Sequence, residues 1–600
     1  MQAAKGLGAM SNQRFWNRVR QQQISRRSLL QSGARAGVAA AGLALVGCGG
    51  DDDDEQQQQQ AQPVAAQADQ QQQEQQAQAS QQVQQQQQQA QPQAEREQQQ
   101  QQQAAVTQAA QTDDAIKRGG TLRIGWDLAL SGYRGPYAQS QHGAFHTPVW
   151  DTLIRYPFDS LEPEPRLAES WEFNGDQTVL SVNLRPGLEF HNARPIDAES
   201  VKASFEAILH EDTPNSQVKG PLAKYVERIE AVDKTTLNFH LLWPGTTIFD
   251  VLNFGHVHDP DEIASLEGYG TVAASGPFKW DPDPHIVDQF ARIVRHENFY
   301  DPAYLDAITY QTFPDRDSMT LALAADEIDL SPSFPAEQID AFKQNPDYNV
   351  VLGVARGLWV FGMVGTGRDG GHEVFDDPRV RRALYRCIDR ERIAIDVFNG
   401  LEQPKHVLWP DYSPGYSAEF DRSYFNVEEA KALMVDAGYG DGTPEIELST
   451  WRGALDNAIA QIIINDASQA GFNFKIHLQD RPAWLERFLA GDHESYINTY
   501  GFHWLHPQTL PVMNYQMRIP NSCAYETPEY QAMIDGFATA DTESGRQALL
   551  DEFNDILDRE PWVAPIATAS GIWTGHKRLQ NLDWSVSGFA PSMEKFWLDA

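Results

Sequence analysis

The chain has 600 residues, of which 83 are acidic and 47 are basic, so that its formal net charge is −36 at neutral pH. This charge balance argues against nucleic-acid binding, which needs a basic face. Three cysteines are too few for a disulfide scaffold, and neither a zinc-ligand spacing nor a motif of the P-loop, GxSxG or HExxH type occurs.

The N-terminal segment has the parts of an export signal. Adjacent arginines, Arg26 and Arg27, precede a weakly apolar run that is well short of the roughly 20 residues needed to cross a bilayer as a helix. These parts are typical of secretory signals, and the arginine pair indicates twin-arginine export. The tetrapeptide LVGC resembles the lipobox of bacterial lipoproteins. This resemblance implies a signal peptide over residues 1–48 and a lipid anchor on Cys48.

Residues 49–116 are rich in aspartate and then in glutamine, with almost no large apolar side chains. Such a segment cannot bury enough apolar surface to offset the entropy lost on ordering. A flexible coil of this length spans about 45 Å from end to end. We therefore interpret the segment as a disordered tether that holds a folded body near a membrane surface.

About 480 residues remain for the body, which is enough for two or three domains with ample core. Alternation of apolar with other residues predicts strands at 121–126, 180–184 and 237–241. Asp197 is expected to cap a helix between the last two strands, because an apolar stripe at helical spacing follows it.

Helical signals become stronger after residue 375. Asp377-Pro378 predicts the start of a helix that runs toward Gly400, and Asn426 predicts the cap of another helix that ends at Gly438. Strand-like segments alternate with these helices and indicate an α/β body. These segments are 446–450 and 474–478.

Three other patterns are interpreted as structural. Cys387 lies on the apolar face of the first of these helices, so that a buried and unreactive thiol is expected. Residues 365–370 satisfy GxGxxG, but the next predicted helix begins too late for a dinucleotide site, which favours a surface loop. Two histidine pairs lack a full ligand set, and we expect no metal and no cofactor. The pairs are His142 with His146 and His256 with His258.

Eight segments of the body occur in the order seen in the solute-binding proteins of ABC importers of the dipeptide, oligopeptide and nickel class. The chain is similar to this family over about residues 120–590. The matching segments are PRLAESWEF, LRPGLEFHNARPIDAESVKASFEAIL, SGPFKW, VRHENFYD, LALAADEIDL, FDDPRVRRALYRCIDRERI, VEEAKALMVDAGY and GDHESYINTYGFHW.

The resemblance implies an α/β fold of the periplasmic binding protein type (type II, cluster C), with two lobes around a cleft and an extra inserted domain. Lobes joined by crossing segments can close on a ligand by hinge motion. The implied ranges are 117–152, 273–355 and 568–600 for lobe I, 153–272 for the inserted domain, and 356–567 for lobe III.

The expected function is the capture of a small ligand, a peptide by resemblance, and its delivery to an ABC permease outside the cytoplasm. The protein is expected to be a monomer held at the membrane by its lipid. An oligosaccharide or another non-peptide solute is the alternative ligand. An exported hydrolase is the alternative of another class, against which stands the absence of a nucleophile elbow or a paired metal motif.

The resemblance also implies which segments contact the ligand: a loop after the first strand, a strand after the lobe crossover, and a segment with a Gly-Asp and Asp-Pro pattern. Two arginines, if they face the cleft, could bind a carboxylate bidentately, although an arginine at such a place is more often a surface residue or a structural ion-pair partner. The matching positions are Tyr133, Trp359, Trp451 and Gly501 to Pro507, which include His503 and Trp504, and the arginines are Arg356 and Arg452.

The last of these segments departs from the family pattern. Peptide-binding members resemble G-D-x-x-D-P, in which the first aspartate pairs with the free amino group of the ligand. Here His503 replaces that acid. The anchor for an ammonium group is therefore missing at neutral pH, and a histidine cation, formed near about pH 6.5, would repel such a group. A peptide held by backbone contacts, an anionic solute and a saccharide stacked on Trp504 and Trp451 all remain open.

Overall fold

The computed structural model describes residues 116–599, apart from 127–146, 158–159, 210–217, 262–272, 287–288, 333–334, 336–337, 452, 502–504, 541 and 583–592. The expected signal peptide with Arg26, Arg27 and Cys48 lies outside the described residues, as does the expected tether up to residue 115. We use the names lobe I, inserted domain and lobe III for the ranges given above.

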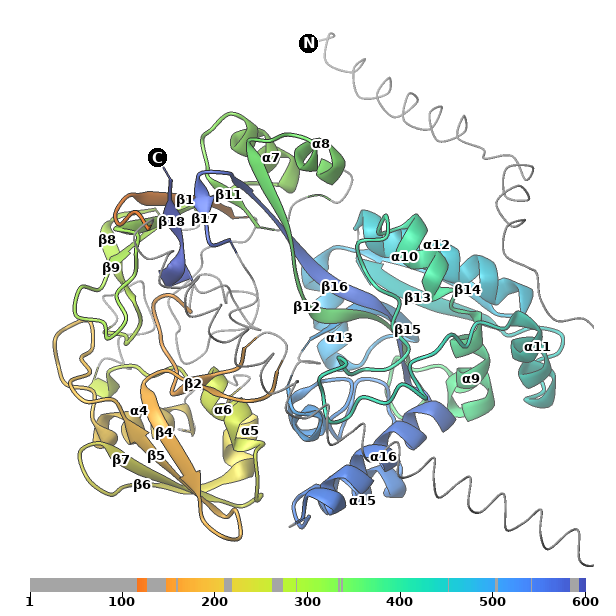
Figure 1. The fold of residues 1–600 in the computed structure, drawn as a ribbon. Helices are drawn as coiled ribbons and strands as arrows, with labels where there is room; N and C mark the ends of the chain where they lie inside the picture. Colours follow the sequence, from red (N-terminus) through yellow and green to blue (C-terminus); the bar gives the residue numbers. More distant parts are fainter. Residues whose placement is uncertain are drawn as a thin grey trace, which may run out of the picture. The chain divides into compact units, whose positions relative to one another are not determined.

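The largest element of the body is a ten-stranded mixed sheet (Figure 1). Its strands follow the order β14-β13-β15-β12-β16-β11-β1-β10-β9-β8. Their bounds are β1 (Thr121–Trp126), β8 (Phe278–Ile286), β9 (Phe290–Arg295), β10 (Ala307–Thr312), β11 (Leu330–Ser331), β12 (Tyr348–Met363), β13 (Glu445–Trp451), β14 (Asn473–Gln479), β15 (Ser495–Gly501) and β16 (Val563–His576). The mixture of such strands with helices confirms the predicted α/β class.

Two long strands connect the halves of this sheet. β12 and β16 pair antiparallel from Tyr348 and His576 at one end to Gly362 and Val563 at the other. The pairing register shifts between Leu352 and Gly357, where the two strands pass from lobe I into lobe III. Such irregularities bend strands locally.

The inserted domain has its own antiparallel sheet, in the order β4-β5-β7-β6, and its described residues also form three helices. Its elements are β4 (Ala168–Phe173), β5 (Val179–Leu184), α4 (Ala198–Leu209), α5 (Lys219–Tyr225), β6 (Val226–Ala231), β7 (Thr236–Leu241) and α6 (Ile248–Phe254), and a two-stranded ladder of β2 (Ile154–Arg155) and β3 (Glu164–Pro165) precedes them. β5 buries Leu180, Val182 and Leu184 on one face, as its alternation predicted. The side chain of Asp197 caps α4 as predicted, because its Oδ1 accepts the backbone N–H of Ser200 at 2.9 Å.

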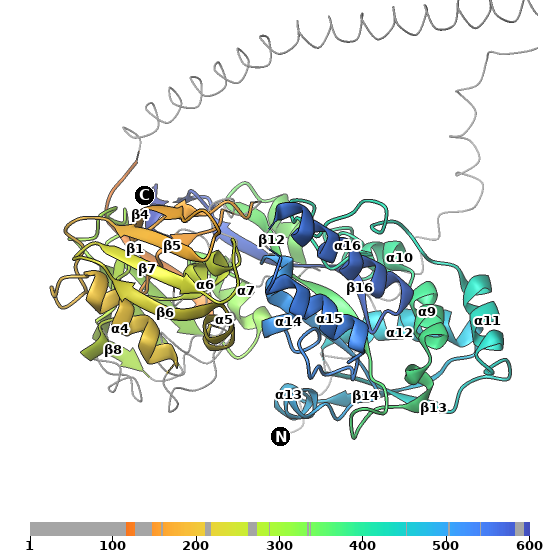
Figure 2. The ribbon, with the colours of Figure 1, turned by 90° about the horizontal axis from the view of Figure 1, so that it is seen from below.

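Helices of lobe III pack on both faces of its part of the large sheet, as expected where parallel strands are buried. On β15, Ile497 packs into the core formed with α9, α11 and α12, whereas the neighbouring Tyr496 packs against Trp484 and Phe488 of α13. The lobe III helices are α9 (Pro378–Cys387), α10 (Arg390–Asp396), α11 (Val427–Asp436), α12 (Ala454–Gln469), α13 (Arg481–Ala490), α14 (Leu510–Met513), α15 (Pro528–Phe537) and α16 (Glu543–Arg559), with 3-10 turns η6 (Glu373–Asp376) and η7 (Pro507–Thr509). Figure 2 shows α15 and α16 side by side.

The helix expected between Asp377 and Gly400 is in fact two helices. α9 ends at Cys387, and Asp389 begins the second helix by accepting the N–H of Arg392 on its side chain at 3.0 Å. The expectation of one continuous helix was wrong, because a second N-cap competes with continuation of the first helix. The helix capped by Asn426 is confirmed as α11, and residues 365–370 form a loop between β12 and η6, as expected.

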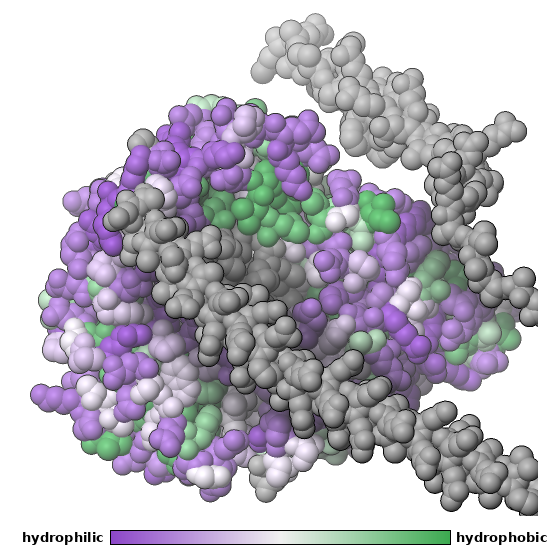
Figure 3. Space-filling model, in the orientation of Figure 1, coloured by the Kyte–Doolittle hydropathy of each residue, from purple (hydrophilic) through white to green (hydrophobic). Residues whose placement is uncertain are grey.

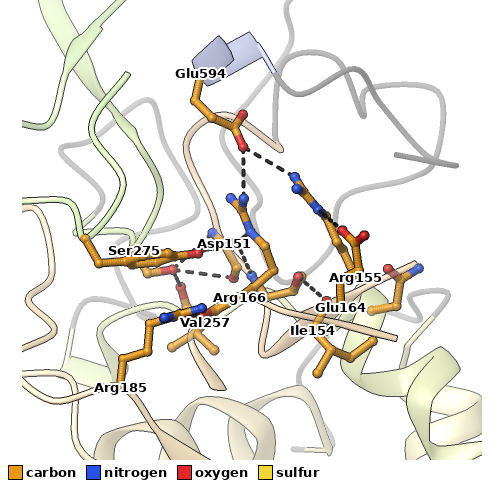
Figure 4. Close-up of polar contacts among 12 residues, drawn as sticks. Asp151, Ile154, Arg155, Glu164, Arg166, Arg185, Val257, Ser275 and Glu594 are labelled. Carbon is orange, nitrogen blue, oxygen red and sulfur yellow. Dashed lines mark hydrogen bonds and ion pairs between the residues drawn. The ribbon is translucent and has the colours of Figure 1, made fainter. Parts of the chain in front are cut away.

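Buried ion pairs fasten the inserted domain to lobe I (Figure 4). Arg166 of the inserted domain donates to Asp151 Oδ1 at 2.8 Å and to Glu594 Oε1 at 2.9 Å, and both acids belong to lobe I. Tyr300, also in lobe I, donates its hydroxyl to Asp151 Oδ2 at 3.0 Å. Glu594 comes from the 3-10 turn η8 (Met593–Lys595), so that this cluster joins segments that are far apart in the chain.

The remaining described elements belong to lobe I. They are α7 (Arg316–Ala324), α8 (Ile339–Lys343) and the short ladder of β17 (Leu579–Gln580) with β18 (Trp597–Leu598). Asp315 caps α7 by accepting the N–H of Ser318 at 2.7 Å.

Candidate functional site

The strand directions bring two edges of the large sheet toward the crossing of β12 and β16. β1, β10 and β11 are mutually parallel and run in the same direction as β12, so that their carboxyl ends point along β12 toward lobe III. β13, β14 and β15 run the opposite way, and the register pairs Gly501 at the end of β15 with Gly357 at the start of the lobe III part of β12. Ligands of open α/β sheets bind outside the carboxyl ends of the strands. The two facing carboxyl edges are therefore the candidate ligand site.

The carboxyl edge of lobe I holds buried polar atoms that have no hydrogen-bond partner among the described residues. These atoms are the indole nitrogen of Trp126, the hydroxyl of Thr312 and the hydroxyl of Ser331, and each belongs to the last residue of its strand. A buried polar group without a partner costs about 1–3 kcal/mol, so that most such groups in native proteins are paired. One donor and two hydroxyls at neighbouring strand ends are thus available to hydrogen-bond a ligand.

The facing edge of lobe III holds a buried acid. Asp456 lies in the first turn of α12, directly after β13, and only 3% of it is exposed. Its Oδ1 has no hydrogen-bond partner, and neither has the hydroxyl of Thr450 in β13. Burial raises the pKa of Asp456 to about 7, although its own backbone N–H, the side chain of Trp451, and the guanidinium groups of Arg481 and Arg316 all lower it.

Arg316 begins α7 in lobe I, whereas Asp456 belongs to lobe III. The guanidinium of Arg316 is the smallest of the named influences that lower the pKa of Asp456.

Trp451 ends β13 and supplies a planar surface at this edge. Its ring is half-buried and lies 5.5 Å from the ring of the fully buried Trp484, centroid to centroid. The guanidinium of Arg481 lies 4.8 Å from the Trp451 centroid. Because both Trp484 and Arg481 pack against the indole, Trp451 is a well-supported surface on which a flat or apolar ligand group can pack.

The structure places some of the expected ligand residues at this edge. Trp451 lies there, and the backbone of Arg356 lies in β12, next to the pair of Gly357 with Gly501. Trp359 is different, because only 8% of it is exposed and its ring packs at 5.9 Å from that of Phe398 in the core of lobe III. A ligand role for Trp359 stays a prediction. Four of the expected residues lie outside the described part of the chain: Tyr133, Arg452, His503 and Trp504.

The surface around the crossing strands is apolar. Figure 3 shows an apolar area below α7, over the lobe I part of β12 and β16, with hydrophilic residues around it. Leu352 of β12 is 44% exposed. Apolar walls with a few convergent polar groups are typical of ligand sites.

Asp456, Thr312 and Ser331 were not among the residues expected from the sequence. An acid in the first turn of a helix is ordinarily interpreted as stabilising that helix, which conceals any other role. Thr312 and Ser331 carry no motif at all. The only available signal was the position of each residue at the end of a strand, and this signal has meaning only once the strand order is known.

The two cysteines of the described body are free, buried thiols. Burial raises the pKa of Cys387 to about 12 and that of Cys523 to about 11, so that neither is a nucleophile at neutral pH. His256 and His258 are both buried, and no group of three potential metal ligands occurs among the residues that the structure describes. Within the same residues, every helix is too short or too polar to span a membrane.

Comparison with known proteins decides the family. Residues 162–519, more than half of the chain, match the family described as bacterial extracellular solute-binding proteins, family 5 Middle. The chain belongs to this family. As a family 5 solute-binding protein it is the extracytoplasmic binding component of an ABC importer and not an enzyme, which removes the alternative of an exported hydrolase.

Relatives of this family 5 protein include di/tripeptide-binding protein 2 of Pseudomonas aeruginosa (strain UCBPP-PA14), which is 26% identical over 465 residues, or 70% of this chain and 84% of the relative. A similar fold occurs in the ABC transporter-associated periplasmic binding protein DppA from Helicobacter pylori, solved in complex with the peptide STSA (TM-score 0.69, 20% identity, 82% and 100% of the two chains). NikA from Brucella suis, solved in complex with Fe(III)-EDTA, is also similar (TM-score 0.69, 20% identity, 80% and 100%). The predicted periplasmic binding protein fold is thereby confirmed.

Proposed function

We propose that the ligand of this importer component is a short peptide, held between the facing carboxyl edges of lobe I and lobe III. The observation that carries the proposal is the set of unpartnered buried polar atoms at these two edges, of which Trp126, Thr312 and Asp456 are the clearest. A peptide has the donors and acceptors that such atoms need, and the relative from Pseudomonas aeruginosa is named a di/tripeptide-binding protein.

Asp456 is the acid that a peptide ammonium group would contact. His503 stands where peptide-binding members of the family carry an aspartate, and Asp456 provides a carboxylate at the same edge of the sheet. A cation beside this buried carboxylate would lower its raised pKa, because an opposite charge favours the ionised form. Peptide binding near neutral pH would then release a proton.

The experiment is calorimetric titration of the full-length protein with di- and tripeptides, each in free and N-acetylated form. Binding of the free forms should be tighter, and its heat should differ between buffers of different ionisation enthalpy near pH 7. Asp456→Asn should abolish the preference for a free amino group. Equal affinity for free and acetylated peptides would refute the role of Asp456, and no affinity for any peptide would refute the peptide itself.

A non-peptide solute is the second candidate. It is favoured by the histidine at position 503 and by the similarity to NikA, which was solved with Fe(III)-EDTA. Mass spectrometry of the ligand that co-purifies with the native protein distinguishes this candidate from a peptide.

We further propose that residues 1–48 direct twin-arginine export, that Cys48 carries a lipid, and that residues 49–116 tether a monomeric body to the membrane. The supporting observations are the Arg26-Arg27 pair, the short apolar run and the LVGC box. Cys48→Ser should move the protein from the membrane fraction to the soluble fraction, and Arg26→Lys with Arg27→Lys should block twin-arginine export. A mature protein that keeps Met1 would refute the anchor.

A further inference from the structure

The inserted domain and lobe III meet at a contact that we call the seam. On the inserted domain the seam consists of Tyr156, Val218, Pro221, Asp250 and Phe254, and on lobe III of Leu505, His506, Thr509 and Met513. α5 and α14 lie on the two sides of this contact (Figure 2). The inserted domain and lobe III are not consecutive in the chain, so that no covalent link joins them directly and the seam is held by non-covalent contacts.

Asp250 is the centre of the polar contacts in the seam. Its carboxylate accepts the Tyr156 hydroxyl at 2.9 Å from its own domain. Across the seam it accepts the backbone N–H of His506 at 3.1 Å and the hydroxyl of Thr509. Only 1% of Asp250 is exposed, and apolar side chains surround it. One carboxyl group therefore accepts hydrogen bonds from both the inserted domain and lobe III.

All the groups that contact this carboxyl are neutral. Tyr156 and Tyr225 remain protonated at neutral pH, because burial raises the pKa of each. Burial, with a smaller effect of Arg546, lowers the pKa of His506 to about 4, so that this ring is uncharged. Among the described residues no cation contacts Asp250, while Arg546 acts on His506 and Glu162 acts on Tyr156.

The inserted domain and lobe III are each connected to lobe I, but by different kinds of contact. Ion pairs of Arg166 with Asp151 and Glu594 fasten the inserted domain to lobe I. Lobe III is joined to lobe I through β12 and β16, whose pairing is irregular at the crossing. A rotation of lobe III about the crossing would leave the ion pairs in place and would separate Asp250 from His506 and Thr509.

We propose that Asp250 makes the contact between the inserted domain and lobe III dependent on protons, so that the seam closes with uptake of a proton and weakens as the pH rises. A carboxyl group exposed by separation of the seam has water in place of its apolar surroundings and therefore ionises at a lower pH. The device would act on any ligand that needs lobe III in its docked position, and it does not depend on the ligand's identity.

The direction of the pH dependence follows from the opposing influences on the pKa of Asp250. Burial raises its pKa to about 7, and the hydrogen bonds from Thr509, Tyr156 and His506 oppose this increase without cancelling it. A group whose pKa is higher in the docked state stabilises that state fully below its ordinary pKa of about 4, and this stabilisation is lost as the pH rises toward 7. Between pH 7 and pH 5 the equilibrium should shift toward the closed seam by about 50-fold.

Hydrogen–deuterium exchange of the full-length, ligand-free protein tests the proposal. Protection factors, corrected for the intrinsic pH dependence of exchange, are measured between pH 5 and pH 8 for peptides covering α6 and residues 505–513. Protection of both peptides should rise by up to about 50-fold as the pH falls from 7 to 5. Peptides from β9 and β14, which contain no seam residue, should not follow this change.

Asp250→Asn should remove the pH dependence of seam protection, because the amide does not titrate. Asp456→Asn is the matched control, since Asp456 is also a buried acid with a pKa near 7 but lies outside the seam, and this variant should keep the wild-type pH dependence. Seam protection that is the same at pH 5 and pH 8, or an Asp250→Asn variant that behaves as wild type, would overturn the proposal.

Thr509 provides a second test if Asp250→Asn does not fold. Thr509→Val removes one donor that favours the ionised carboxylate, so that the midpoint of the protection change should move to higher pH, whereas Thr509→Ser should leave it in place. An unmoved midpoint in Thr509→Val would also contradict the proposal. Because no ligand is present, this result is independent of whether the ligand proves to be a peptide.

Discussion

Removal of Arg166 is expected to destabilise the body strongly. Its side chain is 7% exposed and donates to two buried carboxylates, those of Asp151 and Glu594, whose side chains are 4% and 6% exposed. Arg166→Met keeps most of the side-chain volume and leaves both acids without this cation. Breaking a buried pair in this way costs about 3–5 kcal/mol, because a buried charge is left uncompensated.

The pH dependence of this loss provides an independent check. Burial by itself would raise the pKa of Glu594, but Arg166 and Arg155 outweigh it and hold this pKa below its ordinary value. In the wild type, therefore, the contribution of Glu594 is present above its ordinary pKa of about 4.3 and is lost only in acid. In Arg166→Met the pKa of Glu594 should rise instead, so that protonation relieves the unpaired charge and the loss of stability is smaller at pH 5 than at pH 7.

The assay is urea unfolding followed by tryptophan fluorescence at pH 5 and pH 7. Arg228→Met is the matched control, since Arg228 pairs with Glu227 and Glu230 on the surface, where all three side chains are at least half exposed, and its removal should leave the midpoint unchanged. Arg166→Met with Glu594→Gln should recover part of the loss. A loss below about 1 kcal/mol at pH 7, or an equal loss at both pH values, would refute the account of this cluster.

Three further outcomes are expected. Asp197→Ala should lower the free energy of unfolding by about 1 kcal/mol in the same urea assay, because α4 loses its N-cap, whereas Asp197→Asn should lose little. Trp451→Ala should weaken ligand binding about tenfold by calorimetry, and an unchanged dissociation constant would remove Trp451 from the site. Cys387 and Cys523 should resist alkylation at pH 8 in the native protein and react after unfolding, as read by intact mass, and fast native labelling would contradict their burial.

Much of the local structure could be predicted because its causes lie within a few residues. The alternation in β5, the cap at Asp197 and the cap at Asn426 each specify an element through neighbours in the chain, and the structure contains all three elements. Burial of Cys387 followed from the same helical period. The order of the matching segments was enough to indicate the family, since the family is defined by sequence.

Other features depended on partners that the local pattern does not reveal. The break at Asp389 was missed because a polar residue inside a helical pattern is compatible with both an exposed helix position and a new cap. Trp359 was expected at the ligand and packs beside Phe398 in the core of lobe III, so that its ligand role stays a prediction; one aromatic residue of a strand suits either environment. The ligand roles expected for Tyr133, Arg452, His503 and Trp504 stay predictions.

The sequence by itself determined the α/β class, several strands and capped helices, and the family, since periodicity, caps and motif order act over short distances along the chain. Only the tertiary structure decided which strand ends face each other and which polar groups are left unpaired there. Asp250 and Thr509 show the reason, because they are 259 residues apart in the chain. The Thr509 hydroxyl can donate to the Asp250 carboxylate only when the inserted domain and lobe III are in contact. The free energy of such a contact is set by burial, and burial is a property of the folded assembly of elements rather than of any segment alone.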